Sequence, residues 1–174
     1  MFGWLRRWVD RRVFVIKDQE GNKYLTRVRL FQWRKDGHRI YLHVIHKSDD
    51  DREMHDHPWW FVSFLLWGNY VEHLREGARR VRWINAKLNP AQGHKLELNR
   101  RRDGSEKAVV TLVIGGPNEK EWGFYCPAQD WKGPRKIPTP VASVAEEPDG
   151  CVWVSYRDFL DRKFGPGKWS EEFE

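Results

Sequence analysis

The sequence predicts a single all-β domain, folded as a sandwich or a barrel. Its 174 residues correspond to about one domain and are enough to bury a sizeable core. From residue 13 onward, short segments rich in β-branched and aromatic residues follow one another, separated by turn signals such as Lys35-Asp-Gly-His38 and Arg102-Asp-Gly-Ser105. Helical periodicity is almost absent between these turns. Such a succession is typical of a β-meander, which closes into a sandwich or barrel.

The N-terminal segment differs from the rest, because residues 3–12 show a helical pattern. Trp4, Leu5, Trp8 and Val9 share one face of a helix, and charged residues lie elsewhere on it. We expect a short amphipathic helix that caps the domain or contacts a membrane surface or nucleic acid. Nine strands should follow, at residues 13–17, 24–33, 39–46, 58–67, 69–75, 79–84, 94–100, 108–114 and 121–126.

The composition changes after residue 126. Five prolines fall between residues 127 and 148, which predicts an irregular segment that crosses the surface. Ser155 is then a good helix N-cap and Gly165-Pro166 a stop signal, so a terminal helix should form and dock on the barrel. The expected organisation is a helix over residues 1–12, a barrel over 13–126 and a tail over 127–174.

Composition and charge exclude several classes of protein. A hydrophobic fraction of 40% beside 32% charged residues and a net charge of +6 is not typical of a disordered chain. The longest nearly apolar run, residues 58–67, is about half the length that a membrane-spanning helix needs. Arginines interrupt the N-terminal apolar stretch before a signal peptide could form, so we expect a cytoplasmic protein. Cys126 and Cys151 are expected as thiols rather than as a disulfide.

The histidine pair His55-Asp56-His57 indicates a metal site. In an extended backbone, side chains two residues apart point to the same face, so the two imidazoles can converge on one ion. Imidazole is a ligand for Fe, Zn, Ni, Cu and Mn.

His94 is the third candidate ligand. Alternation in His94-Lys-Leu-Glu-Leu98 sends His94 to the core-facing side, where an imidazole needs a partner. That partner is a metal ion or, in the alternative, a backbone carbonyl or a tyrosine hydroxyl.

These residues resemble the two metal motifs of the cupin superfamily of small β-barrels. In the first motif, His-x-His enters a strand and is followed by a Glu and, further on, a Gly; His55-Asp56-His57 and Gly68 fit that layout. The second motif supplies a His after a Pro/Gly turn, as Pro90-Ala-Gln-Gly93-His94 does. The resemblance covers about residues 39–126 and extends to uncharacterised cupin-like proteins of phage and bacterial genomes. It implies a jelly-roll barrel.

The resemblance also implies an activity. The Glu of the first motif falls at Phe61 or Val62, which cannot bind metal, so the site implied is His55, His57 and His94. Three-histidine cupins include dioxygenases that resemble cysteine dioxygenase, which implies an Fe(II)-dependent oxidoreductase. Because three neutral ligands retain the charge of the ion, we expect a small anionic substrate, a thiol or a carboxylate. Zn, Ni or Mn are alternative metals, and an isomerase, lyase or ligand-binding cupin is the alternative function.

Three further residues are candidates for the site. Alternation over residues 39–46 makes His43 a hydrogen-bond partner of a ligand, a fourth ligand, or a histidine at the surface or rim. Tyr125 or Cys126, but not both, should face the cavity as a catalytic side chain, unless it only packs. Asp56 should point away from the histidines and be solvated or paired with a nearby arginine, like its neighbours Asp51 and Glu53.

Arginine clusters provide a second alternative function. Arg79, Arg80, Arg82 and residues 100–102 lie on or beside predicted hairpins, and a basic surface near tryptophan is compatible with nucleic-acid binding. Acidic residues are interspersed throughout, so we expect a solvated face and no nucleic-acid partner. A small molecule is the expected partner, and the chain is expected to be a monomer or a homodimer.

Overall fold

The structure is a computed structural model that describes residues 11–17, 21–49, 53–128 and 150–164. Residues 1–10 of the expected N-terminal helix and most of the Pro-rich segment lie outside these residues, and residues 11–12 form a turn. The strands and the terminal helix of the described part are, in chain order, β1 (Val13–Lys17), β2 (Lys23–Gln32), β3 (Arg39–Ile45), β4 (Met54–His55), β5 (Phe61–Trp67), β6 (Tyr70–Leu74), β7 (Gly77–Val81), β8 (Ile84–Lys87), β9 (Lys95–Leu98), β10 (Val109–Gly115), β11 (Gly123–Pro127), β12 (Cys151–Ser155) and α3 (Tyr156–Phe164).

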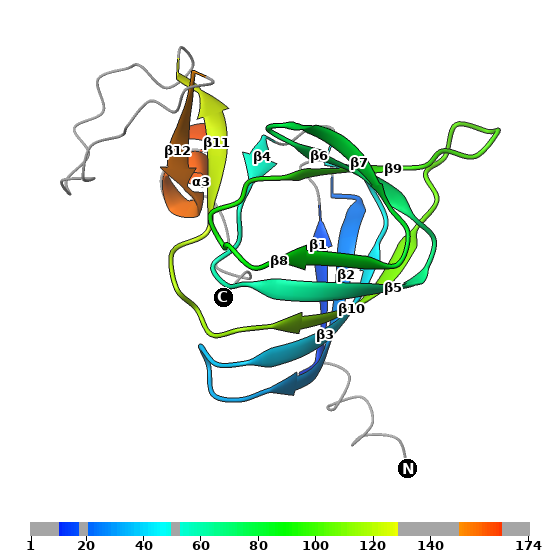
Figure 1. Cartoon of the computed structure of the whole chain (residues 1–174), viewed down its shortest axis with the longest axis horizontal. Coiled ribbons are helices and arrows are strands. Elements are labelled where there is room, and N and C mark those ends of the chain that lie inside the picture. The colour runs from blue at the N-terminus through cyan, green and yellow to red at the C-terminus, as the bar shows by residue number, and fades with distance from the viewer. Residues whose placement is uncertain (1–10, 18–20, 50–52, 129–149, 165–174) are drawn as a thin grey trace.

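Three antiparallel sheets form the barrel. The largest has the order β1-β2-β3-β10-β5-β8, and the two small sheets have the orders β7-β6-β9 and β12-β11-β4. Figure 1 shows β6, β7 and β9 opposite β3, β5 and β10, so that the sheets curve around a common interior. The all-β barrel that the sequence predicts is therefore confirmed.

The inward face of the largest sheet carries polar side chains among apolar ones. On β3, the buried positions are held by Arg39, Tyr41, His43 and Ile45, while the positions between them are apolar and less buried. Antiparallel sheets usually turn their apolar face inward and their polar face to water. An interior that collects polar side chains is suited to a binding site. Apolar side chains occupy the opposite face of the three central strands: Ile40, Leu42, Val44, Val62, Phe64, Leu66, Val110, Leu112 and Ile114.

Apolar side chains close the interior at one end. A cluster of buried residues joins the large sheet to the β7-β6-β9 sheet and contains Leu65, Tyr70 and Val109. A smaller buried cluster of Tyr41, Trp59, Phe61 and Val113 lies near the histidine-bearing loop. The two clusters leave the polar part of the interior between them.

The structure corrects three strand predictions. The strand expected over residues 79–84 is two strands, β7 and β8, which belong to different sheets because the chain turns at Arg82 and Trp83. The two-residue strand β4 was not predicted. Strand β12 lies in the segment expected to be irregular, and it pairs with β11 along its whole length.

The terminal helix α3 begins where the sequence predicts and packs against β11. The Asp158 N–H donates to Ser155 Oγ over 3.2 Å, and the Ser155 hydroxyl donates to the Asp158 carboxylate over 2.8 Å, a reciprocal N-cap. Phe159 stacks on Phe124 with ring centroids 4.1 Å apart, which holds the helix against β11. Both cysteines are thiols, Cys126 buried and Cys151 partly so. Among the described residues, no helix has the length and apolar character to cross a membrane.

Candidate metal centre

A short backbone bridge brings the predicted histidines together. The His55 N–H donates to the His94 carbonyl over 3.0 Å, and the His94 N–H donates to the His55 carbonyl over 2.9 Å. His57 lies on the loop after β4 and turns toward the same point. The ring centroids are 4.9 Å apart for His55 and His94 and 5.0 Å apart for His57 and His94. The clustering predicted from the two motifs is confirmed.

The three imidazoles fit a divalent metal ion. One nitrogen from each ring can be chosen so that all lie within 4.8 Å of one another, and His57 Nε2 is 2.8 Å from His94 Nε2. Two metal–nitrogen bonds of about 2.1 Å at right angles would place their nitrogens about 3.0 Å apart. Phe61 faces His57 with ring centroids 4.8 Å apart, so an aromatic ring borders the cluster on that side. The three histidines could therefore hold a divalent metal.

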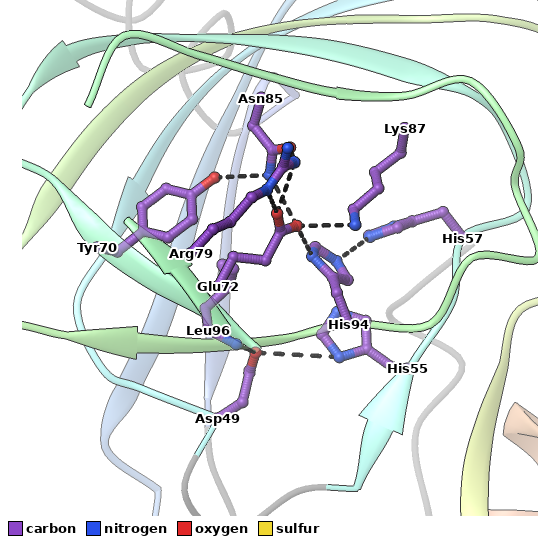
Figure 2. A network of polar contacts seen from close by, with 10 residues as sticks. All are labelled: Asp49, His55, His57, Tyr70, Glu72, Arg79, Asn85, Lys87, His94 and Leu96. Atoms are coloured by element: carbon purple, nitrogen blue, oxygen red, sulfur yellow. Dashed lines mark hydrogen bonds and ion pairs between the residues drawn. The ribbon is translucent and has the colours of Figure 1, made fainter. Parts of the chain in front are cut away.

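Glu72 of β6 fixes the orientation of His94 (Figure 2). Its Oε1 lies 2.7 Å from His94 Nδ1, and its side chain is fully buried. Burial alone raises the pKa of Glu72, but hydrogen bonds from His94, Asn85 and Lys87 outweigh it, so the pKa lies well below its ordinary value. An ionised carboxylate only accepts, so His94 Nδ1 carries the proton and Nε2 carries the lone pair a metal needs. The partner of His94 is thus a carboxylate, not the carbonyl or tyrosine considered from sequence.

Three more side chains complete this network, and sequence reasoning found none of them as part of the site. Asn85 Nδ2 donates to Glu72 Oε1 over 2.9 Å, Arg79 Nε donates to Glu72 Oε2 over 2.8 Å, and Lys87 Nζ is 3.0 Å from Glu72 Oε1. Lys87 is 1% exposed, and burial lowers the pKa of its ammonium. The carboxylate of Glu72 is therefore the counter-charge for a buried lysine as well as a partner of His94.

Asp56 holds the histidine loop in place. It is fully buried, accepts hydrogen bonds of 2.8 Å from the Gly123 N–H and from Trp153 Nε1, and forms an ion pair with Lys120. Burial raises the pKa of Asp56, and the bonds from Lys120, Gly123 and Trp153 oppose that rise. The expectation of a solvated Asp56 is wrong, because β11 and β12 close around it. Glu53 is exposed as expected, and Asp51 lies outside the described residues.

The histidines open into a cavity of about 790 Å³ inside the barrel. Among the described residues, seven basic but only two acidic side chains line it. The aromatic rings of Tyr41, Trp59, Phe61 and Trp122 form much of the remaining wall. The cavity is therefore suited to a small anionic molecule with an apolar part. The basic lining residues are Arg27, Arg29, Arg34, Lys35, Arg39, Lys120 and Arg157.

His43 lines this cavity but is not one of the clustered candidate ligands. It is 8% exposed, and its Nε2 accepts a hydrogen bond of 3.0 Å from Arg27 Nε. Burial, assisted by the charge of Arg27, lowers the pKa of His43 well below 6.5, so the ring is neutral with its proton on Nδ1. Of the alternatives considered for His43, the surface position is excluded; a catalytic role stays a prediction.

Tyr125 and Cys126 do not line the cavity in the part of the chain that the structure describes. The Tyr125 hydroxyl donates to the Ala91 carbonyl, and its ring packs beneath the Arg75 guanidinium. Cys126 is fully buried in a cluster with Val152 and Val154. The expectation that one of the two faces the cavity is wrong, because Trp122 and Phe124 occupy that face of β11.

The arginine clusters are largely engaged with the protein itself. Arg79 binds Glu72 and Asn85, and Arg80 Nη1 donates to Asn69 Oδ1 and Asn99 Oδ1 over 2.8 and 3.0 Å. Arg101 Nη1 donates to Ser105 Oγ and to the Glu106 carbonyl. These contacts give the arginines structural roles, and nucleic-acid binding is not needed to explain them.

Comparison with known proteins identifies the fold. No protein-family model and no curated protein matches the sequence. Among solved structures, a cupin-2 domain protein from Rhodospirillum rubrum superposes with a TM-score of 0.50 at 12% identity, covering 67% of this chain and 76% of its own. A cupin 2 conserved barrel domain protein from Rhodopseudomonas palustris gives 0.49 at 14% identity, covering 68% and 80%. A DMSP lyase from Ruegeria pomeroyi gives 0.44 at 14% identity, covering 62% and 55%.

The chain therefore has the fold of the cupin barrels, as the resemblance in its histidine motifs implied. Its three histidines lie together inside that barrel, in an arrangement consistent with a cupin metal site. At these identities the likeness defines the fold and leaves the reaction to be argued from the site.

Proposed function

We propose that this chain is a metal-dependent cupin enzyme that acts on a small anionic molecule. The observation that carries the proposal is the cluster of His55, His57 and His94 at the wall of a cavity lined mainly by basic and aromatic side chains. Three protein ligands leave coordination positions open, which a reacting site needs and a structural site avoids.

The reaction we propose is oxidation by dioxygen with Fe(II) as the metal. When bound, Fe(II) would supply a redox-active Lewis acid with open positions for a thiol or carboxylate substrate and for dioxygen. Glu72 holds His94 in the tautomer that presents Nε2 to the site. Phe61 and Trp59 pack against His57 and exclude water from that side.

Metal analysis of protein purified without a polyhistidine tag tests the site. We expect about one equivalent of divalent metal in the wild type and none in His55→Ala, His57→Ala or His94→Ala, because each change removes one ligand. His73→Ala is the matched control, since His73 lies on β6 and pairs with Glu97 at the surface. If the His57→Ala protein binds metal as fully as the His73→Ala protein, the proposed site is wrong.

Oxygen uptake tests the reaction. Protein loaded anaerobically with Fe(II) and then mixed with air-saturated buffer should consume dioxygen when a thiol or small carboxylate substrate is supplied. The same protein loaded with Zn should not. Full metal occupancy without oxygen uptake on any thiol or carboxylate would refute the dioxygenase and place the chain among non-redox cupins. The cytoplasmic location stays a prediction and is checked by fractionating cells.

A further inference from the structure

A row of arginines runs along one wall of the cavity, on the two neighbouring strands β2 and β3. Arg27 pairs across the strands with His43, and Arg29 pairs with Tyr41. Arg39 lies at the end of β3, and all five of these side chains line the cavity. The guanidinium of Arg27 lies beside the buried His43.

The charge of Arg27 has no counter-charge bound to it among the described residues. Its Nε donates to His43 Nε2 over 3.0 Å, and the guanidinium lies over the ring of Tyr41, 4.9 Å from the centroid. Both partners are neutral, and within the described ranges no carboxylate pairs with Arg27 or accepts from its two terminal nitrogens. Burial lowers the pKa of Arg27, but a guanidinium remains charged. A charge that is partly withdrawn from water without an opposite charge beside it is costly, so it is rarely kept without a function.

In the described part of the chain, the hydrogen bonds and ring contacts of the neighbouring arginines are also to neutral groups. Arg29 lies over the ring of Phe14, 4.8 Å from its centroid. Arg39 donates to the Gly37 carbonyl and to Asn118 Oδ1 and lies over the ring of Trp59. By contrast, Arg79 in the network behind the metal site is held directly by a carboxylate, that of Glu72. The protein therefore neutralises the charge behind the histidines and leaves the charge of the β2–β3 wall for a ligand.

We propose that Arg27, assisted by Arg29, binds an anionic group of the substrate at the β2–β3 wall, separately from the metal centre. The paired N–H donors of a guanidinium match the paired oxygens of a carboxylate or a phosphate, so the group bound there is one of these two. Successive inward positions of a strand are about 6.6 Å apart, so the two arginines can bind one such group between them. His43 acts as a positioning residue, because it accepts from Nε and leaves the terminal nitrogens of Arg27 directed elsewhere.

This proposal rests on the proposed function, since the same cavity holds the three histidines, and it makes that function more specific. The substrate would have two polar ends, one at the metal and one at Arg27, with an apolar part against the aromatic wall. Such a molecule is a small organic acid or phosphate ester that carries a further group able to bind metal.

Anion binding to chelator-treated, metal-free protein tests the proposal. Inorganic phosphate and succinate are the probes, measured by calorimetry at low ionic strength and by the rise in Tm that a bound ligand causes. We expect at least one of the two to bind the wild type, and its affinity to fall at least tenfold in Arg27→Met. Arg80→Gln is the control, since Arg80 is an exposed arginine outside the cavity with neutral partners. The probe that binds more tightly shows whether the site prefers a phosphate or a carboxylate group.

Thermal stability is a second measurement, in which an arginine with only a structural role would give a different result. We expect Arg27→Met to have a Tm equal to or above that of the wild type, because an uncompensated charge is removed. If it fails to fold, or if both probes bind it as tightly as they bind Arg80→Gln, the proposal is overturned. Arg29→Gln gives an independent check. We expect a smaller loss of affinity for the probe, and an unchanged affinity would contradict the proposal. Because the assay uses metal-free protein, a failure of metal binding would refute the proposed function and leave this result intact.

Discussion

Glu72→Gln is the most informative single change, because the Glu72 carboxylate serves two groups at once. Glutamine keeps the size of the side chain and removes its charge. His94 Nδ1 then donates to a neutral amide oxygen, which fixes its tautomer less strongly than a carboxylate does, and Lys87 loses the counter-charge 3.0 Å away. The change should therefore weaken both metal binding and folding, through two separate partners.

The two effects have different magnitudes. Removing one partner of a buried ion pair costs about 3–5 kcal/mol. The lower end is expected here, because burial already lowers the pKa of Lys87 and the lysine can lose its proton. Arg79 adds little, since its side chain is 51% exposed. Mutating the hydrogen-bond partner of a metal ligand lowers metal affinity by about 10- to 100-fold, and the lower end is expected here because the amide oxygen of glutamine still accepts from His94.

Two measurements separate these effects. Urea unfolding of metal-free protein gives the change in unfolding free energy, and competition with a chelator gives the metal affinity. Glu97→Gln is the matched control, because its ion pair with His73 is exposed and should cost below about 1 kcal/mol. The double variant Glu72→Gln/Lys87→Met should recover most of the stability but none of the metal affinity. Equal stability and equal metal affinity in the Glu72 and Glu97 variants would refute this reasoning.

Three further predictions follow from other parts of the structure. Metal-free protein should lose stability as the pH falls below 6.5, because the unfolded chain binds a proton at His43 and the buried ring of the folded chain does not. The loss for His43 is up to about 1.4 kcal/mol per pH unit. Urea midpoints should fall less steeply with pH in His43→Gln than in the wild type, and an equally steep fall contradicts the prediction. Gly93→Ala should cost about 1–3 kcal/mol and weaken metal binding, because a Cβ there would lie 2.7 Å from the Tyr125 ring beside His94; an unchanged urea midpoint would show that the ring can move. We expect the apolar outer face of β3, β5 and β10 to pack against a second copy of the chain. Light scattering should therefore give the mass of a dimer for the wild type and the mass of a monomer for Leu112→Lys. A monomeric wild type contradicts the homodimer.

The fold was predictable because its strands are marked locally. Turn signals and β-branched segments predict nine strands, and each of these regions contains a strand in the structure. The errors occur where pairing depends on distant residues. Strand β12 is stabilised by β11, about 28 positions before it, and its own Val-Trp-Val pattern was outweighed by the prolines that precede it. The break between β7 and β8 arises because the chain changes sheet, which a continuous run of polar residues does not reveal.

Only part of the candidate site could be predicted from the sequence, for a similar reason. His55 and His57 are two residues apart, and their convergence follows from strand geometry alone. Glu72 could have been found, because Tyr70-Val-Glu-His-Leu74 alternates and places Glu72 on the same face as Tyr70. Lys87 could not, because β8 buries Asn85 and Lys87 and exposes Ile84, the reverse of the usual pattern. Inverted polarity of this kind is stabilised by partners on other strands and has no local signal.

The two tryptophans beside the histidines give the site an optical reporter. The ring of Trp59 lies 5.8 Å from that of His57, and the ring of Trp122 lies 6.5 Å from that of His55. An ion with a partly filled d shell quenches indole fluorescence at such range, whereas d¹⁰ zinc does not. Of the eleven tryptophans in the chain, these two should darken when iron, nickel or copper enters and stay bright with zinc. The tryptophan fluorescence of the protein therefore reports which class of metal ion is bound, without any added dye.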